Sequence, residues 1–279
     1  MATAPIETPR QNPIQALGGA AFFALEGLGD VSLFFWSIVT WLVRRRPAQG
    51  TLFHCFYLVG VRSVPVVAIT GLFIGMVLAV QSYNQFAELG LQTRLGAIIN
   101  ISVVRELGPV LAATMIAGRV GSAMAAELGT MSVTDQIDAM TCLGVNPVHY
   151  LAVPRFVACV VLIPLLTVLA DFTGIMGGAL ICTKIYEVEA HHYWTRAQEF
   201  VGAWDVTSGL IKSVFFGATI AVISCHRGFN CRAGAEGVGR AATEAFVASF
   251  IAILVIDFFL AMFLNTLAQQ LWPSGGKLI

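Results

Sequence analysis

Charged side chains occur inside otherwise apolar stretches of the sequence, and they are its clearest candidates for chemistry. They are Arg105, Glu106, Arg119, Glu127, Asp171 and Asp257. A charge that faces hydrocarbon is costly, so each of these groups should face a partner, a cavity or the interior of a helix bundle. For the last four, the simplest interpretation is ion pairing that holds helices together. Arg105 and Glu106 differ because they lie close to Pro109, which weakens a helix.

Acidic groups in such positions can also carry protons or ions. Glu106, Asp171 and Asp257 would form the relay of an ion- or proton-coupled secondary transporter. We keep this class of protein as the alternative, although the sequence shows no obvious inverted repeat of the kind found in many secondary transporters.

Two groups of histidine and cysteine residues have the composition of metal sites but not the number of ligands. Cys225, His226 and Cys231 supply three ligands without a clear fourth, so a structural loop is the better interpretation. His191 and His192 precede a Tyr-Trp pair, which is typical of an aromatic belt at a membrane surface. We therefore predict no metal site.

The sequence also lacks a site for nucleotide phosphates. The sole Gly-Lys pair, Gly276-Lys277, has neither the upstream glycine nor the following hydroxyl residue of a phosphate-binding loop. The glycine-rich residues 234–240 follow no predicted strand, which argues against a dinucleotide site. We predict that this chain binds no cofactor and that any ATP is bound by another chain.

The composition assigns the chain to the membrane proteins. Of its 279 residues, 57% are hydrophobic and 11% are charged, against roughly 25% charged in average globular chains. Sixteen Lys and Arg balance sixteen Asp and Glu, so no basic surface for nucleic acid is expected. These values exclude a soluble enzyme and predict an all-α integral membrane protein.

Five apolar stretches are predicted to cross a bilayer as helices. They cover residues 64–86, 95–126, 156–183, 209–225 and 245–268. The second is long enough to be tilted or broken. Pairs of small residues recur in the spans, and such pairs let helix backbones approach closely in a compact bundle or at a dimer face. They are Gly71 and Gly75, Gly118 and Ser122, and Gly174 and Gly178.

An earlier apolar segment, residues 16–46, is predicted to be an interfacial helix. Its uninterrupted apolar run, Val31–Val43, would be about 20 Å long as a helix, short of the roughly 30 Å hydrocarbon core. The three arginines that follow this run fit a helix that lies on the membrane. A sixth span is the alternative. Residues 1–15 are predicted to be a disordered tail, and residues 16–279 to form one domain.

The segments that connect the spans differ in positive charge. Eight Lys and Arg residues flank the spans on one side and three on the other. The positive-inside rule therefore predicts a cytoplasmic N-terminus and an extracytoplasmic C-terminus. Lys212, near the outer end of the fourth span, counts against this orientation but does not reverse it.

The polar segment between the second and third spans, Glu127–Arg155, is predicted to contain a short amphipathic helix. Ser132 and Asp135 resemble a cap at its start, and Gly144 is placed to end it. Its apolar face must be buried against the bilayer, its own bundle or a partner protein, and its acidic residues disfavour an anionic bilayer surface. The periodicity does not decide between the other two.

The sequence around this helix is similar to that of a known family. Arg105–Arg155 contains, in family order, the runs RELGP, AGRVGS, AELGTM and QIDAM and a final Pro-Arg pair. It resembles the MlaE/YrbE permease family, and the resemblance extends from the interfacial helix through the fifth span. It implies a membrane subunit of an ATP-binding-cassette (ABC) complex that moves phospholipid or a related hydrophobic molecule.

The resemblance also implies partners. The permease would work as a homodimer in the inner (cytoplasmic) membrane, with two cytoplasmic ATPase subunits and an extracytoplasmic carrier of the Mce class. The loop after the second span would supply a coupling helix that fits a groove of the ATPase. Carried over by position, the coupling residues are Glu127, Gly129, Thr134, Asp135, Ile137, Asp138, Met140 and Gly144.

A lipid path is the last feature that the resemblance implies. Members of the family open a lipid-binding pocket near the position of Arg105 and Glu106, and a guanidinium suits a phosphate headgroup. The first span would supply an apolar wall for the acyl chains, although such a stripe more often serves helix packing. The candidates are Leu72, Met76, Leu78, Val80 and Tyr83. The reaction would be vectorial transport, with no covalent chemistry in this chain.

Overall fold

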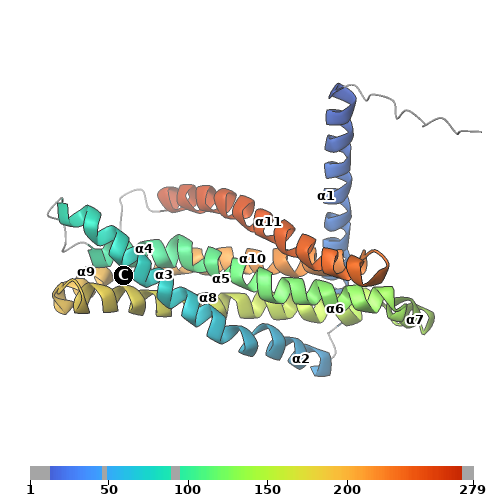
Figure 1. The fold of residues 1–279 in the computed structure, drawn as a ribbon, viewed down its shortest axis with the longest axis horizontal. Coiled ribbons are helices and arrows are strands. Elements are labelled where there is room, and N and C mark those ends of the chain that lie inside the picture. Colours follow the sequence, from blue (N-terminus) through green and yellow to red (C-terminus); the bar gives the residue numbers. More distant parts are fainter. Residues whose placement is uncertain (1–12, 46–48, 89–94, 272–279) are drawn as a thin grey trace, which may run out of the picture.

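The structure, a computed structural model, describes residues 13–45, 49–88 and 95–271. Within these ranges every regular element is helical, so the predicted all-α membrane fold is confirmed. Six helical segments there are long and apolar enough to cross a membrane, and five of them form one elongated bundle (Figure 1). The six are Leu25–Arg44, Gly50–Phe86, Leu95–Val133, Val148–Lys184, Ala203–Phe229 and Gly234–Gln270.

The first helical run of the bundle is longer than predicted. It joins α2 (Gln49–Val59) to α3 (Val64–Glu88) through the short 3-10 turn η1 (Val61–Ser63). The predicted span, 64–86, corresponds to α3. Hydropathy missed α2 because polar residues such as His54 interrupt its apolar pattern.

The second run contains two π-helical turns. It consists of α4 (Leu95–Ser102), η3 (Val103–Leu107), α5 (Gly108–Ile116), η4 (Ala117–Gly121) and α6 (Ser122–Val133). Pro109 has no N–H, so it cannot donate the hydrogen bond that an α-helix would form at this position. The N–H of Gly108 donates to the carbonyl of Val103, five residues earlier, which is the hydrogen bond of a π-helix. The run continues seven residues past the predicted end at 126, because a helix can leave the bilayer without a change in its backbone.

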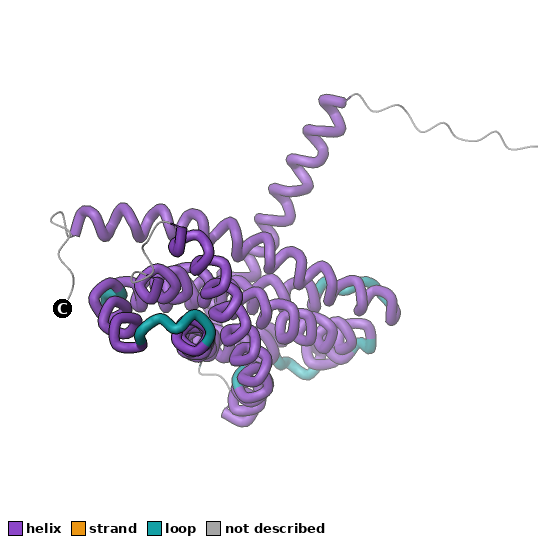
Figure 2. The backbone as a smooth tube through the Cα atoms, turned by 60° about the vertical axis from the view of Figure 1, so that its left-hand side comes forward, coloured by secondary structure: helices purple, strands orange, loops and turns teal. Residues whose placement is uncertain are grey.

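The remaining elements complete the bundle. They are α7 (Gln136–Cys142), η5 (Val148–Ala152), α8 (Val153–Lys184), α9 (Ala190–Phe200), α10 (Ala203–Phe229) and α11 (Gly234–Leu271). The last three predicted spans lie inside α8, α10 and α11, each of which extends beyond the predicted bounds at both ends. Loops are short and lie at the ends of the helices (Figure 2). One end of the bundle carries α7, and the opposite end carries α9 (Figure 1).

Helix α1 (Pro13–Arg44) runs across the long axis of the bundle (Figures 1 and 2). It contacts the bundle near its C-terminal end, where Phe34 packs edge-on to His226 and Trp41 lies 5.6 Å from the ring of His149. The apolar part of α1, Leu25–Arg44, is long enough to span a bilayer, but only 6% of it is buried. Because α1 runs across the long axis of the bundle, it has the direction that a helix lying on the membrane surface requires. The interfacial placement therefore remains our prediction.

The first residues of α1 overlap the predicted N-terminal tail. Residues 13–15 are helical, since proline fits the first turn of a helix, where its missing N–H would have no partner. Residues 1–12 of the predicted tail lie outside the described residues.

Glycine pairs hold α3 and α8 in backbone contact. A Cβ added to Gly75 would collide with the carbonyl oxygen of Gly174, and one added to Gly71 would collide with the backbone of Ala170. Gly178 in turn lies against Ile99 of α4. The predicted close approach therefore serves the interior of the bundle at these positions rather than a dimer face.

Candidate functional site

A network of ionic side chains lies in the half of the bundle that is distant from α7. We call it the Lys212 cluster, and its members are Arg105, Glu106, Asp205, Lys212, Asp257 and Asn265. The ammonium of Lys212 lies 2.5 Å from the carboxylate of Glu106 and 3.0 Å from that of Asp257. The Lys212 side chain is only 2% exposed, so it is a buried cation that joins η3, α10 and α11.

The position of Pro109 explains one further contact of Lys212. In a regular α-helix the N–H of residue 109 would bond to the carbonyl of Arg105, and proline leaves that carbonyl without its α-helical donor. The Lys212 ammonium lies 3.4 Å from this oxygen and donates to it. The buried cation therefore supports the backbone of the π turn as well as two carboxylates.

The Arg105 side chain is the more accessible cation of the cluster. Its guanidinium donates to the amide oxygen of Asn265 on α11 and lies 3.9 Å from the carboxylate of Asp205 on α10. A third of the side chain is exposed, as is 41% of the Glu106 side chain. Each can therefore contact a ligand without breaking the buried pair of Lys212 with Asp257.

Asp171 does not join this cluster. One oxygen of its carboxyl is buried without a hydrogen-bond partner, and it lies in contact with Gly108, where a Cβ would collide with it. Glu106 and Asp257 instead share one cation. The structure thus does not bring the three predicted relay residues together, and it pairs two of them with the same cation.

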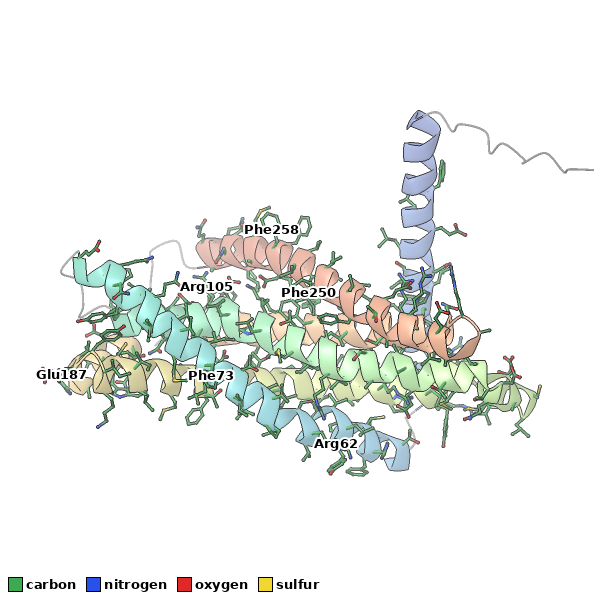
Figure 3. The ribbon with its side chains drawn as sticks, viewed as in Figure 1. Arg62, Phe73, Arg105, Glu187, Phe250 and Phe258 are labelled. Atoms are coloured by element: carbon green, nitrogen blue, oxygen red, sulfur yellow. The ribbon has the colours of Figure 1, made fainter. Side chains whose placement is uncertain are left out.

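Apolar surface suitable for acyl chains lies on α3. A groove of about 470 Å³ is lined by Ile69, Thr70, Phe73, Ile74, Val77, Leu78 and Leu107. Phe73 and Val77 are 59% and 60% exposed, and Phe73 points away from the bundle (Figure 3). Because Leu107 follows Glu106 directly, the π turn η3 contributes both to the Lys212 cluster and to this groove.

Only one of the predicted wall residues lines that groove, namely Leu78. The ring of Tyr83 stacks on that of Tyr186 at 3.7 Å, and both Met76 and Tyr83 pack against the small core cluster around Ile99. The backbone carbonyl of Leu72 lies against Gly177 of α8, and Val80 is 42% exposed. Most of the predicted wall therefore serves helix packing.

The sequence did contain signals for the residues that we missed. Ile69, Phe73 and Val77 recur at a spacing of four residues, which places them on one face of a helix. Lys212 stood out as a single cation inside an apolar span, but it was used only to judge orientation. A lone lysine within a span is itself a sign of a buried partner.

The predicted coupling segment has a different construction from the one expected. Glu127 and Gly129 belong to the continuous helix α6, and only α7 is a separate short helix. Ser132 is not its cap, because its hydroxyl donates to the carbonyl of Phe229. Asp135 is the residue before α7, in the left-handed conformation at φ 57°, and its side chain makes no capping hydrogen bond.

Helix α7 presents two different faces. Ile137 and Met140 are partly buried and pack against the main hydrophobic core. Asp138 is exposed, as are Thr134 and the nearby Leu143, which is 80% exposed. Gly144 follows with φ 77°, so its predicted role at the end of the helix is confirmed.

The helix that leads into α7 is tied to its neighbours. The carboxylate of Glu127 lies 2.9 Å from the guanidinium of Arg155, whose side chain is 8% exposed. Arg155 also donates to the carbonyl of Leu151 at 2.8 Å. Gly129 lies against Cys231 of the loop between α10 and α11. Helix α6, which leads into α7, is therefore joined to α8 by an ion pair and packs against the loop between α10 and α11.

Histidine and cysteine side chains are the candidates of the sequence for a metal site. No group of three or more His, Cys, Asp or Glu side chains in the described part of the chain is arranged to hold a metal ion. The interpretation of Tyr193 as an aromatic belt residue is wrong, because its side chain is 1% exposed and its hydroxyl donates to Asn100 at 3.3 Å. Burial raises the pKa of the Tyr193 phenol.

Comparison with known proteins agrees with this architecture. The model of the family described as Permease MlaE matches residues 52–263. A probable ABC transporter permease protein of Synechocystis is 44% identical over 204 residues, which cover 73% of this chain and 78% of that protein. A probable ABC transporter permease protein of Rickettsia felis is 38% identical over 247 residues, which cover 88% and 95% of the two chains.

A third relative has a more specific name. The intermembrane phospholipid transport system permease protein MlaE of Haemophilus influenzae is 33% identical over 250 residues, which cover 89% of this chain and 96% of that protein. The family model, over residues 52–263, covers the groove on α3, helix α7 and every member of the Lys212 cluster except Asn265. The chain is therefore a multi-pass membrane protein that belongs to the MlaE family of ABC transporter permeases.

Proposed function

We propose that this permease moves phospholipid, or a related hydrophobic molecule, between the inner membrane and an extracytoplasmic carrier of the Mce class. The observation that carries the proposal is the π turn η3. This turn exposes part of the Arg105 guanidinium, and its last residue, Leu107, lines the apolar groove on α3. A phospholipid requires this combination of a charged contact for its headgroup and apolar surface for its tails.

The charges of the cluster fit a headgroup that carries both signs. The guanidinium of Arg105 can contact a phosphate, and the partly exposed carboxylate of Glu106 can contact an ammonium group. In this proposal Leu78 lies beside the acyl chains, together with Phe73 and Val77. Tyr83, Met76 and Leu72 instead support the groove from within the bundle.

A second copy of the chain would complete the site. Arg105 faces α10 and α11, whereas the groove lies on the α3 side of the same helical run. Helix α11 exposes a row of apolar side chains that includes Phe250 and Phe258 (Figure 3). A homodimer that packs on this face would place the Lys212 cluster, with its proposed headgroup contacts, between the two subunits.

Energy would enter at the opposite end of the bundle. We propose that the exposed face of α7, with Asp138 at its centre, contacts a cytoplasmic ATPase subunit, which binds and hydrolyses ATP. The buried face of α7, with Ile137 and Met140, would pass the movement to the bundle core. The pair of Glu127 with Arg155 supports this route because it joins α6 to α8.

The orientation follows from charge. The segments near the α7 end carry more Lys and Arg than those near the α9 end, so the positive-inside rule places α7 in the cytoplasm. The N-terminus would then be cytoplasmic and the C-terminus extracytoplasmic. The Lys212 cluster would lie in the outer half of the membrane, where an extracytoplasmic carrier can receive or deliver lipid.

The test is transport by the reconstituted complex. The permease and its ATPase subunits are placed in liposomes that contain a fluorescent phospholipid, and ATP-dependent transfer to the carrier is measured. Arg105→Ala should reduce both transfer and the phospholipid that remains bound to purified protein. Lys184→Ala, at the exposed end of α8, is the matched control. Unchanged transfer and unchanged bound lipid in Arg105→Ala would contradict the proposal.

A further inference from the structure

A second cavity lies between α2, α6 and α8, in the half of the bundle that carries α7. Its volume is about 430 Å³. It is separate from the Lys212 cluster, since Arg119 in its wall is about 20 Å from Arg105 along the same helical run at 1.5 Å per residue. Arg62, which also lines it, and Arg105 lie toward opposite halves of the bundle (Figure 3).

The charged part of the wall is strongly biased toward cations. It contains three arginines, Arg62, Arg119 and Arg155, and one acid, Glu127. Glu127 is used by Arg155 at 2.9 Å, and Arg119 donates to the buried hydroxyl of Ser63 at 2.7 Å. The described wall therefore carries two more positive than negative charges, and its one carboxylate forms its ion pair with Arg155.

The rest of the wall is mostly apolar. Its members include Leu58, Val59, Val120, Met124, Met131 and Leu151. An inorganic anion would gain little from such a surface, whereas an acyl chain would gain by covering it. A ligand that fits both parts has an anionic headgroup and at least one hydrocarbon chain.

We propose that this cavity binds an anionic phospholipid from the leaflet at the α7 end, with its phosphate at Arg62 and Arg119 and an acyl chain along α6. The proposal goes beyond transport through the Lys212 cluster, because it assigns a second lipid site near the opposite membrane surface. Arg119 belongs to the π turn η4, so an occupied site would also bias the shape of the helical run that leads to α7.

The test measures lipid binding to the purified full-length chain by native mass spectrometry. Phosphatidylglycerol is compared with phosphatidylcholine of identical acyl chains and with inorganic phosphate. Arg62→Gln removes an exposed charge, and Ala123→Trp fills the cavity without a change in charge. Arg45→Gln is the matched control, because Arg45 is exposed at the end of α1 and does not line the cavity.

We expect phosphatidylglycerol to bind more tightly than phosphatidylcholine, and Arg62→Gln to weaken its binding about tenfold, as the loss of one charge-assisted contact predicts. Ala123→Trp should weaken binding of both lipids, and Arg45→Gln should weaken neither. Equal phosphatidylglycerol binding by wild type, Arg62→Gln and Ala123→Trp would overturn the proposal. Displacement of the lipid by inorganic phosphate at equal concentration would overturn it as well, since that result indicates a site for free phosphate.

One further variant separates this site from the proposed transport site. Arg105→Ala lies outside the cavity and should leave phosphatidylglycerol binding at Arg62 unchanged. If Arg105→Ala leaves transport and bound lipid unchanged while Arg62→Gln weakens phosphatidylglycerol binding, only the transport proposal is contradicted. If Arg105→Ala reduces transport while Arg62→Gln leaves phosphatidylglycerol binding unchanged, only the second site is contradicted.

Discussion

Replacement of Lys212 by methionine tests whether the Lys212 cluster stabilises the bundle through its buried cation. Methionine keeps most of the side-chain volume but leaves Glu106 and Asp257 without their shared counterion. At the 3.0 Å separation from Asp257, Coulomb's law with an effective dielectric constant near 20 gives about 5.5 kcal/mol for that pair. Measured losses on breaking buried ion pairs are about 3–5 kcal/mol.

The exposure of the two carboxylates reduces this value. Asp257 is 20% exposed and Glu106 is 41% exposed, so solvent screens part of the lost interaction. We expect Lys212→Met to lower the free energy of unfolding by about 2–4 kcal/mol. The measurement is denaturant unfolding of the purified chain in a mild detergent, followed by circular dichroism. Lys184→Met, at an exposed position, is the control and should be close to wild type.

One further variant identifies the cause of the loss. The triple variant Lys212→Met, Glu106→Gln, Asp257→Asn removes the uncompensated charges and should recover much of the stability. If the triple variant is no more stable than Lys212→Met, the loss comes from packing and our electrostatic reasoning is refuted.

Three other predictions concern the bundle core, the α9 end and helix α7. Gly75→Ala places a Cβ against the carbonyl of Gly174 and should destabilise the chain by about 1–3 kcal/mol in the same unfolding assay, whereas Gly29→Ala, which has open space, should not. Burial raises the pKa of the Tyr193 phenol in the folded chain, so the unfolded chain loses the phenolic proton at a lower pH. The free energy of unfolding should therefore fall as the pH rises above about 10. Tyr193→Phe should flatten that part of a profile of stability against pH. Asp138→Ala should leave the isolated permease as stable as wild type but reduce ATP-driven transfer in the reconstituted complex, and full transfer would remove Asp138 from the contact with the ATPase.

The sequence predicted the parts of the fold that depend on hydrophobic burial. All five predicted spans lie inside long helices, since a run of apolar residues is the direct requirement of a bilayer. It did not predict where the helices end, because residues such as Glu127 continue a helix beyond the apolar region without any local signal to stop. The cap assigned to Ser132 failed for a related reason, as its hydroxyl bonds to α10 rather than to its own segment.

The candidate site was predicted only in part, and the reason is again three-dimensional. Arg105 and Glu106 were identified because a charge in an apolar helix is costly wherever it lies. Their partners Lys212, Asp205 and Asn265 are distant in sequence, so spacing alone gave no means of joining them. Leu78 is the one predicted wall residue that lines the groove on α3, because glycine contacts set which side of α3 faces α8.

The two π turns of the second helical run, η3 and η4, have a consequence for insertions and deletions. Each adds one residue to a helical turn, and one residue corresponds to about 100° of rotation in an α-helix. Deletion of a single residue within η3 would leave a continuous helix of nearly the same length, but it would rotate α4 relative to α5. Leu95 and Ile99, now buried in the small core cluster near α9, would then turn away from it. The length of this helical run therefore determines which face meets which neighbour. A change in length that preserves every apolar residue would still misassemble the α9 end of the bundle.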